Sequence, residues 1–212
     1  MNTLIIQYLP SGETSRTRRL RQAFLKHVTG TVVTLDLLQN PPNFMTSDVK
    51  AILFKRSYLG ESLNADERAV IGKNDHFLSL LRAADRVVFA YPMHNYSMPA
   101  IVKAFFDAVI IKGETFDLEG FNYRGLLGGK RALALITSGG VYEEGSDAAE
   151  LDHCFKLQNI LCRFVGFDQS EVISVQGTDM FPPEELEPRF DQAEQAIRDL
   201  CAAWYSEDRA LV

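Results

Sequence analysis

The feature that most constrains this fold is a buried-strand pattern that passes directly into a helical pattern within residues 86–111. Residues 87–90 read Val-Val-Phe-Ala, an apolar run that follows charged residues and is stopped by Pro92. Such a run predicts a strand that is buried on both faces of a parallel sheet. After Pro99 the apolar residues recur every four positions in two adjacent rows, which predicts a helix with a wide apolar face. The two rows are Ile101, Phe105 and Val109, and Val102, Phe106 and Ile110.

The rest of the chain repeats this alternation of strand and helix patterns. Asn64 followed by Glu67 matches a capping box and predicts the start of one of the helices. Five strands alternating with helices indicate an α/β fold with a parallel sheet that is covered by helices on both faces. No repeat or linker-like segment interrupts the pattern, so we expect a single domain over residues 1–212. The other four strand patterns lie at residues 4–8, 32–35, 132–136 and 172–175.

Composition excludes several classes of protein. A net charge of −6 and a pI near 5.3 argue against a general nucleic-acid binder, which needs a basic face to neutralise phosphates. The three cysteines, Cys154, Cys162 and Cys201, have no Cys-x-x-Cys spacing, which argues against a disulfide framework and a zinc site. The first ten residues do not resemble a signal peptide, and no apolar stretch approaches the length of a membrane span. We therefore expect a cytoplasmic protein without a metal, a nucleic-acid partner or a membrane partner.

Residues 11–17, which follow the first strand, predict an anion site. Ser11, Ser15 and Thr17 supply hydroxyls, Gly12 permits a tight turn, and the start of a helix offers free amides that suit a phosphate. The alternative is that Ser15 only caps the helix, and residue types alone favour it. Neither a G-x-G-x-x-G motif after a strand nor a P-loop motif is present, so neither a classical dinucleotide fold nor a P-loop NTPase is indicated.

Two further loops follow the third and fourth strands. Residues 92–96, Pro-Met-His-Asn-Tyr, predict the stiff wall of a binding site. The alternative is a rigid turn with an aromatic side chain that fills the core. A lone histidine such as His94 is more often structural than a metal ligand. Gly139 and Gly140 can bring main-chain amides close to a flat ligand, although that loop taken alone favours a simple strand-to-helix turn. The loops after the first, third and fourth strands meet at one edge of such a sheet, so together they suit a flat heterocycle with a phosphorylated tail, such as FMN.

The motifs, in this order, resemble the FMN-dependent NADH-azoreductases, a flavodoxin-like family that overlaps in activity with the NAD(P)H:quinone oxidoreductases. The resemblance implies the strand order 2-1-3-4-5 and a single FMN-binding domain. It also implies a homodimer with the flavin at the subunit interface, which agrees with the wide apolar face of the helix after Pro99. The motifs that carry it are S-x-x-x-S-R-T at 11–17, P-M-H-N-Y at 92–96, G-x-T-F at 113–116, G-L-L-G-G-K at 125–130 and T-S-G-G at 137–140.

The resemblance also implies roles for individual residues. The FMN phosphate is assigned to Ser11, Ser15, Arg16 and Thr17. The isoalloxazine wall is assigned to Pro92, Met93, His94, Asn95 and Tyr96, with the Asn95 amide directed towards flavin N5. The pyrimidine edge is assigned to Ser138, Gly139 and Gly140, and the substrate side to Phe116 and Tyr142. No side chain is required as a nucleophile, and Tyr142 and His94 are the candidate proton donors.

These assignments describe an enzyme that takes a hydride from NADH or NADPH and passes two electrons to a quinone or azo compound by a ping-pong sequence. One alternative is a flavodoxin-type electron carrier, against which the long segments 43–85 and 113–130 argue. A second alternative is hydrolysis of the phosphopantetheine on acyl carrier protein. That reaction needs a metal or a nucleophile–base pair, and the sequence offers no convincing cluster of either.

Overall fold

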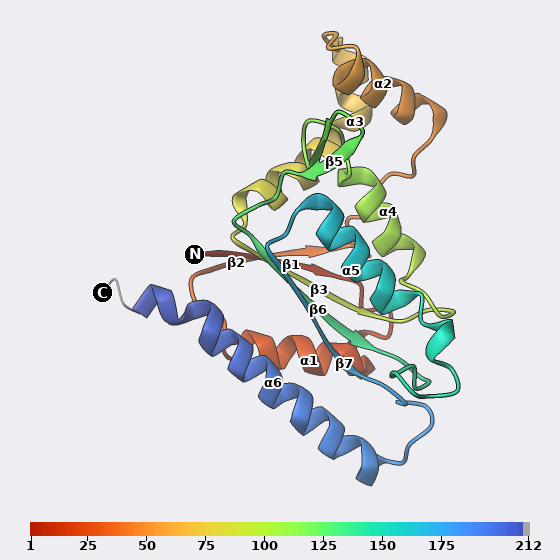
Figure 1. The fold of residues 1–212 in the computed structure, drawn as a ribbon, viewed down its shortest axis with the longest axis vertical. Coiled ribbons are helices and arrows are strands. Elements are labelled where there is room, and N and C mark those ends of the chain that lie inside the picture. The colour runs from red at the N-terminus through yellow and green to blue at the C-terminus, as the bar shows by residue number, and fades with distance from the viewer. Residues whose placement is uncertain (210–212) are drawn as a thin grey trace.

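A parallel sheet of five strands forms the centre of the computed structural model, which describes residues 1–209 (Figure 1). Its order is β2-β1-β3-β6-β7, and every neighbouring pair runs parallel. Two shorter strands, β4 and β5, form a separate antiparallel hairpin. The strands are β1 (Asn2–Gln7), β2 (Thr31–Asp36), β3 (Arg86–Pro92), β4 (Phe116–Glu119), β5 (Asn122–Gly125), β6 (Arg131–Thr137) and β7 (Gln169–Val175).

The predicted parallel sheet is therefore confirmed. Its order is 2-1-3-4-5 when the strands of the sheet alone are counted along the chain. The numbering in the structure differs because we predicted no strands in the glycine-rich segment that contains the β4–β5 hairpin.

Within residues 1–209, five helices and two short 3₁₀ turns lie between the strands, and a sixth helix follows the last strand. Figure 1 shows α1 and α6 side by side along one side of the sheet, α4 and α5 along the other, and α2 and α3 extending towards one end of the molecule. Within residues 1–209, no helix has both the length and the apolar character required to cross a bilayer. The helices are α1 (Arg16–Leu25), α2 (Ser47–Tyr58), α3 (Ala65–Ala83), α4 (Ala100–Val109), α5 (Cys154–Val165) and α6 (Pro183–Arg209), and the turns are η1 (Gly12–Thr14) and η2 (Ala149–Leu151).

The core has two parts because successive side chains of a strand point to opposite faces of the sheet. Ile5 and Val88 belong to an apolar cluster that includes buried residues of α1 and α6. Their strand neighbours Leu4 and Phe89 belong to a second cluster, with buried residues of α2, α3, α4 and α5. All but the last residue of β3 are buried, as the apolar run at 87–90 predicted.

The wide apolar face of α4 is covered within the chain. Phe105 and Phe106 are at most 2% exposed, and both belong to the core cluster that α3 also lines. The Phe106 ring stacks on Phe89 at 5.0 Å between centroids, and the Phe105 ring contacts Phe77 of α3 at 5.5 Å. The width of this face therefore reflects packing against both the sheet and α3, and it gives no support to a subunit interface.

The capping box at the start of α3 is confirmed and also joins α3 to α2. The Glu67 amide donates to Asn64 Oδ1 at 2.9 Å, and the Asn64 amide donates to Glu67 Oε2 at 2.7 Å. Lys55 of α2 donates to both carboxylate oxygens of Glu67 at 2.8 and 2.9 Å. These bonds, that from Lys55 foremost, lower the pKa of Glu67, so the carboxylate stays charged.

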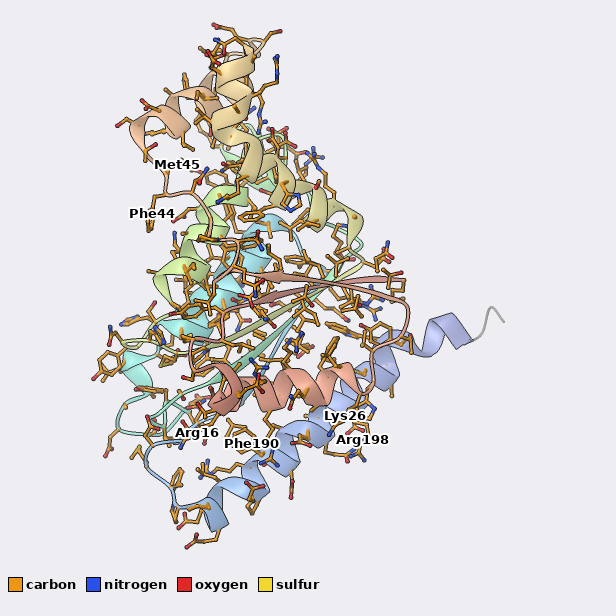
Figure 2. The ribbon with its side chains drawn as sticks, turned by 180° about the vertical axis from the view of Figure 1, so that it is seen from behind. Arg16, Lys26, Phe44, Met45, Phe190 and Arg198 are labelled. Atoms are coloured by element: carbon orange, nitrogen blue, oxygen red, sulfur yellow. The ribbon has the colours of Figure 1, made fainter. Side chains whose placement is uncertain are left out.

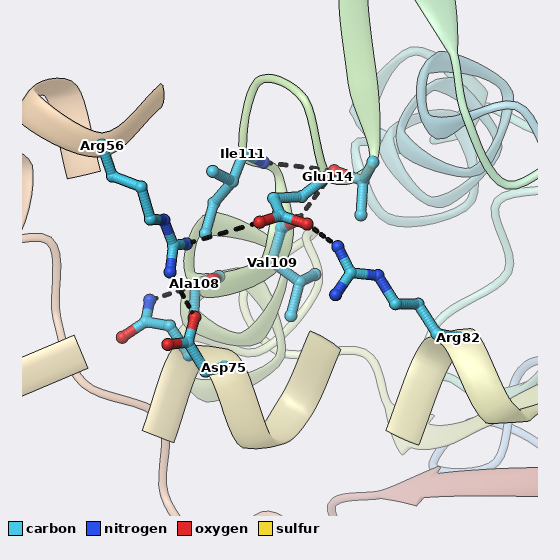
Figure 3. Close-up of polar contacts among 9 residues, drawn as sticks. Arg56, Asp75, Arg82, Ala108, Val109, Ile111 and Glu114 are labelled. Atoms are coloured by element: carbon cyan, nitrogen blue, oxygen red, sulfur yellow. Dashed lines mark hydrogen bonds and ion pairs between the residues drawn. The ribbon is translucent and has the colours of Figure 1, made fainter. Parts of the chain in front are cut away.

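Glu114, in the turn after α4, links three segments through two arginines. Figure 3 shows Arg56 of α2 and Arg82 of α3 approaching its carboxylate from opposite sides. Arg56 also pairs with Asp75 of α3 at 2.7 Å. Because the Glu114 side chain is only 21% exposed, its interactions are less screened by solvent than those of a surface pair.

We expect Glu114→Gln to lower the free energy of unfolding by about 1–2 kcal/mol, because it leaves Arg56, whose side chain is 23% exposed, and the more exposed Arg82 without their shared carboxylate. The matched control is Glu119→Gln, which removes a pair with Arg124 whose side chains are 60% and 57% exposed. That control is expected to change stability by less than about 0.5 kcal/mol. Urea titrations that show the same loss in the free energy of unfolding for the two variants would contradict the linking role of Glu114.

Candidate functional site

A cleft of about 330 Å³ opens at the carboxyl ends of the central strands, where the loops after β1, β3, β6 and β7 meet. Ligands of open α/β sheets bind at this edge because the loops from neighbouring strands converge there. The cleft is lined by Pro10, Ser11, Thr14, Ser15, Arg16, Thr17, Pro92, Met93, His94, Thr137, Gly139, Thr178 and Asp179. The structure thus brings residues of all three predicted loops together.

The loop after β1 presents the start of α1 to this cleft. Ser15 is the N-cap residue, and its Oγ accepts a hydrogen bond from the Arg18 amide at 3.3 Å. The capping interpretation of Ser15 is therefore confirmed. The other amides of the first helical turn have no acceptor within the helix, so this end of α1 retains donors and positive dipole character. Capping and anion binding are compatible here.

Thr17 differs from the other hydroxyl residues of this loop. Its side chain is fully buried, and its Oγ1 lies 2.6 Å from Thr137 Oγ1 at the end of β6. This hydrogen bond joins α1 to the sheet directly beneath the cleft. The hydroxyl therefore positions the helix start, and the backbone amide of Thr17 is the group left for a ligand.

The loop after β3 is held in one conformation by hydrogen bonds at both of its ends. The Met93 amide donates to the Thr137 carbonyl at 2.8 Å, and His94 and Ser97 exchange two backbone hydrogen bonds of 2.9 Å. Between them, Asn95 and Tyr96 have φ values of +46° and +66°, the left-handed conformation that a type I′ turn needs. Asparagine tolerates this conformation, whereas for tyrosine it costs about 1 kcal/mol. The loop is a stiff turn, as its two prolines predicted.

The loop after β6 turns its carbonyl groups away from solvent. The Ser138 hydroxyl donates to the Gly140 carbonyl at 2.9 Å, and the Ser138 carbonyl accepts from the Thr178 amide at 2.9 Å. Across residues 1–209, no hydrogen bond uses the amides of Gly139 or Gly140. These two amides are therefore available to acceptors on a ligand, as we predicted from the glycine pair.

Thr178 and Asp179, in the loop after β7, are cleft residues that we did not predict. Arg16 Nη1 lies 2.5 Å from Asp179 Oδ1, so this loop contributes charge to the site. The sequence contained a signal for this loop, because Gly177-Thr178-Asp179 follows the last strand of the sheet. It was missed because we considered only the loops after the first, third and fourth strands.

Tyr142 does not line the cleft, but its hydroxyl lies beside Gly140. Its ring meets Tyr96 edge to face at 6.1 Å, and its amide donates to Gln176 Oε1 at 2.6 Å. Burial, and then the nearby Tyr96, raise the pKa of Tyr142, so its hydroxyl is protonated at neutral pH. Asn95, Ser138 and Gly140 also stand outside the lining but are chain neighbours of residues within it, and Tyr96 lies two residues from His94.

Phe116, which we assigned to the substrate side of the flavin, does not line this cleft in a single chain, and its assignment stays a prediction. Phe116 lies in β4, is 8% exposed and packs on Phe164 of α5 at 5.1 Å. It lines a different, mainly apolar cavity of about 400 Å³ together with Met45 and residues of α2. Figure 2 shows Met45 well apart from Arg16 of the cleft.

The three cysteine thiols are buried and protonated at neutral pH. Burial raises the pKa of Cys154 to about 12, with a further contribution from Asp152. Burial likewise raises the pKa of Cys162 to about 11 and that of Cys201 to about 12. In the described part of the chain, residues 1–209, no group of three or more histidine, cysteine or acidic side chains could hold a metal ion.

The sheet order and the cleft define a class of protein. A helix start suited to a phosphate, a stiff wall and Gly139, with its free amide, meet at one cleft of a 2-1-3-4-5 sheet, which is the arrangement of a mononucleotide-binding α/β protein. The model of the flavodoxin-like fold family matches residues 1–200. The chain belongs to this family.

Two quinone oxidoreductases and one azoreductase structure are similar to most of this chain. An FMN-dependent NADH:quinone oxidoreductase 3 of Bacillus cereus is 36% identical over 166 residues, 76% of this chain and 77% of that protein. An FMN-dependent NADH:quinone oxidoreductase of Shewanella loihica is 33% identical over 143 residues, 68% of this chain and 70% of that protein. The crystal structure of an azoreductase from Bacillus anthracis superimposes with a TM-score of 0.85 at 27% identity, covering 95% of this chain and 98% of the other.

Proposed function

We propose that this protein is an FMN-dependent NAD(P)H oxidoreductase that reduces quinones, azo compounds or both. The observation that carries this proposal is the single cleft in which the start of α1, the 92–94 wall and Gly139 meet. The names of the similar NADH:quinone oxidoreductases and of the similar azoreductase structure support the same reaction class. Bound FMN would supply hydride transfer between a nicotinamide and an acceptor.

The donor groups of the cleft fit this cofactor. Ser11, Ser15, Arg16 and the amide of Thr17 would hold the phosphate, because hydroxyls, a guanidinium and helix amides all donate to it. The pyrimidine edge would be held by the loop at 138–140, where Gly139 and Gly140 carry amides that are free of intrachain acceptors. The wall would consist of Pro92, Met93, His94, Asn95 and Tyr96.

The chain contributes electrostatics more than proton transfer. Amides directed at the pyrimidine edge stabilise negative charge that develops there, and they need no reorganisation because the loop is already fixed by the Ser138 hydrogen bonds. The Asn95 amide, in its left-handed turn, is proposed to face N5 of the ring. His94 lines the cleft, and Tyr142, which is protonated at neutral pH, is the other candidate to donate a hydrogen bond to an acceptor molecule.

We further propose that residues 1–212 form one FMN-binding domain, with helices on both faces of the sheet, that acts as a cytoplasmic homodimer with NADH or NADPH as donor. The resemblance to the azoreductases supports the dimer. Large apolar side chains exposed on the surface also support it, because aromatic residues, such as the stacked Phe54 and Tyr58 rings 5.0 Å apart, are enriched at protein interfaces. They include Phe44, Phe54, Tyr58 and Phe121, which are 73%, 49%, 51% and 104% exposed.

Anaerobic titration of the FMN-loaded protein tests the reaction class. We expect NADH or NADPH alone to remove the visible absorbance of the bound flavin, and a quinone or azo dye to restore it with stoichiometric turnover. A flavodoxin-type carrier would keep its absorbance until a reductase was added. Release of phosphopantetheine from acyl carrier protein, without any flavin reduction, would instead support the hydrolase alternative.

A further inference from the structure

The loop after β7 is fixed to the loop after β6 by a ladder of backbone hydrogen bonds. The amides of Gly177, Thr178 and Asp179 donate to the carbonyls of Gly140, Ser138 and Gly139 at 2.9, 2.9 and 3.1 Å. Gly177 has a φ of +74°, and a Cβ there would lie 2.3 Å from the ring of Phe181, so the turn requires glycine. The backbone of Asp179 is thus held at the cleft, and only its side chain has freedom to move.

The Asp179 carboxylate lies between two groups that we assign to the ligand. One oxygen is 2.5 Å from Nη1 of Arg16, the guanidinium proposed to hold the phosphate. The other oxygen lies where a Cβ on Gly139 would approach within 2.5 Å, beside the glycine whose amide we assign to the pyrimidine edge. Among the lining residues that the structure describes, Arg16 and Asp179 are the only lysine, arginine or acidic side chains.

We propose that Asp179 is a specificity residue that competes with the phosphate of the flavin for Arg16. This inference rests on the proposed function and adds a determinant of the choice between phosphorylated and unphosphorylated flavin. A phosphate that binds at the start of α1 takes over the guanidinium, so the Asp179 carboxylate loses its partner and repels the new negative charge. Riboflavin carries no phosphate and leaves the Arg16–Asp179 pair in place.

The Asp179 side chain is 74% exposed and that of Arg16 is 47% exposed, so the competition is moderate in size. It weakens FMN binding without preventing it. It also depends on ionic strength, because exposed charges are screened within about 10 Å at 0.1 M salt. The preference for FMN over riboflavin is therefore set by the balance between Arg16 and Asp179, and not by Arg16 alone.

The test is a fluorescence titration of the full-length protein with FMN and, separately, with riboflavin. Asp179→Asn is expected to tighten FMN binding about fivefold, the size expected when an exposed ion pair no longer competes, and to leave riboflavin affinity unchanged. Asp179→Ser is expected to act in the same direction. The control is Asp168→Asn, which makes the same change in net charge at the amino end of β7, where Asp168 Oδ2 accepts from the Gly129 amide.

Two results would overturn the inference. Weaker FMN binding by Asp179→Asn would mean that the carboxylate positions Arg16 for the phosphate. An equal increase in affinity for FMN and for riboflavin would mean that the Asp179 side chain only occupies space that the flavin ring needs. A wild-type protein that binds neither flavin would instead refute the proposed function itself, so the two failures are distinguishable.

Discussion

Ser15→Asp is expected to weaken FMN binding about 100-fold while leaving the stability of the fold nearly unchanged, because a carboxylate within about 4 Å of a phosphate repels it by several kcal/mol at moderate effective dielectric. Aspartate is as good an N-cap residue as serine, so the hydrogen bond that Ser15 Oγ accepts from the Arg18 amide is retained. The substitution therefore separates the two roles of Ser15, capping and anion binding.

The matched control is Thr46→Asp. Thr46 is the N-cap of α2, where its Oγ1 accepts from the Val49 amide at 3.4 Å, and it does not line the cleft. Equilibrium binding by flavin fluorescence, with thermal melts of both variants, measures the effect. Unchanged FMN affinity in the Ser15 variant, with its melting temperature preserved, would show that the start of α1 does not hold the phosphate.

Gly125→Ala is expected to lower the free energy of unfolding by about 3 kcal/mol, at the upper end of the cost of overpacking. A Cβ at position 125 would lie 2.3 Å from the backbone nitrogen of Gly166 and 2.4 Å from its Cα. Backbone cannot move aside as a flexible side chain can, so the β4–β5 hairpin must separate from the end of α5. The nearby hydrogen bond from the Leu127 amide to the Val165 carbonyl, 2.9 Å long, is strained by the same movement.

Gly128→Ala is the control in the same segment. Its nearest neighbour would be Asp168 Oδ1 at 3.8 Å, an ordinary contact, so its stability is expected to stay within about 1 kcal/mol of wild type. A loss of about 3 kcal/mol corresponds to a fall of roughly 6–12 °C in melting temperature for a chain of this size. Calorimetry that gives the two variants the same melting temperature would show that the hairpin and α5 do not approach each other closely.

Hydrophobic periodicity predicted the sheet because its central strands are buried on both faces. The run at 87–90 has no polar residue, and a parallel strand is the element that needs none. The hairpin at 116–125 was missed for the opposite reason. Its strands have four residues each and are mostly exposed, so they carry no apolar alternation. The two apolar rows of α4 were correctly assigned to a helix, but periodicity alone could not distinguish a neighbouring helix of the same chain from a second subunit.

The site was predictable where topology alone determines position. Parallel strands bring Ser15, Met93 and Gly139 to one edge of the sheet regardless of how their side chains pack, and all three residues line the cleft. Pairings between side chains were not predictable in this way. The burial of the Thr17 hydroxyl against Thr137 depends on the register of α1 over β6, which no local pattern records. The Arg16–Asp179 pair joins residues more than 160 positions apart in the chain.

The central claim is that three separate loops hold one flavin. An NMR titration of uniformly isotope-labelled protein with FMN, followed through the backbone amide resonances, tests it most directly. The amide resonances of Arg16, Asn95 and Gly139 are predicted to shift together and to saturate at one FMN per chain. Those of the β4–β5 hairpin are expected to shift only if a second subunit places its hairpin near the flavin. Shifts confined to one of the three loops, or saturation of each loop at a different FMN concentration, would contradict the claim.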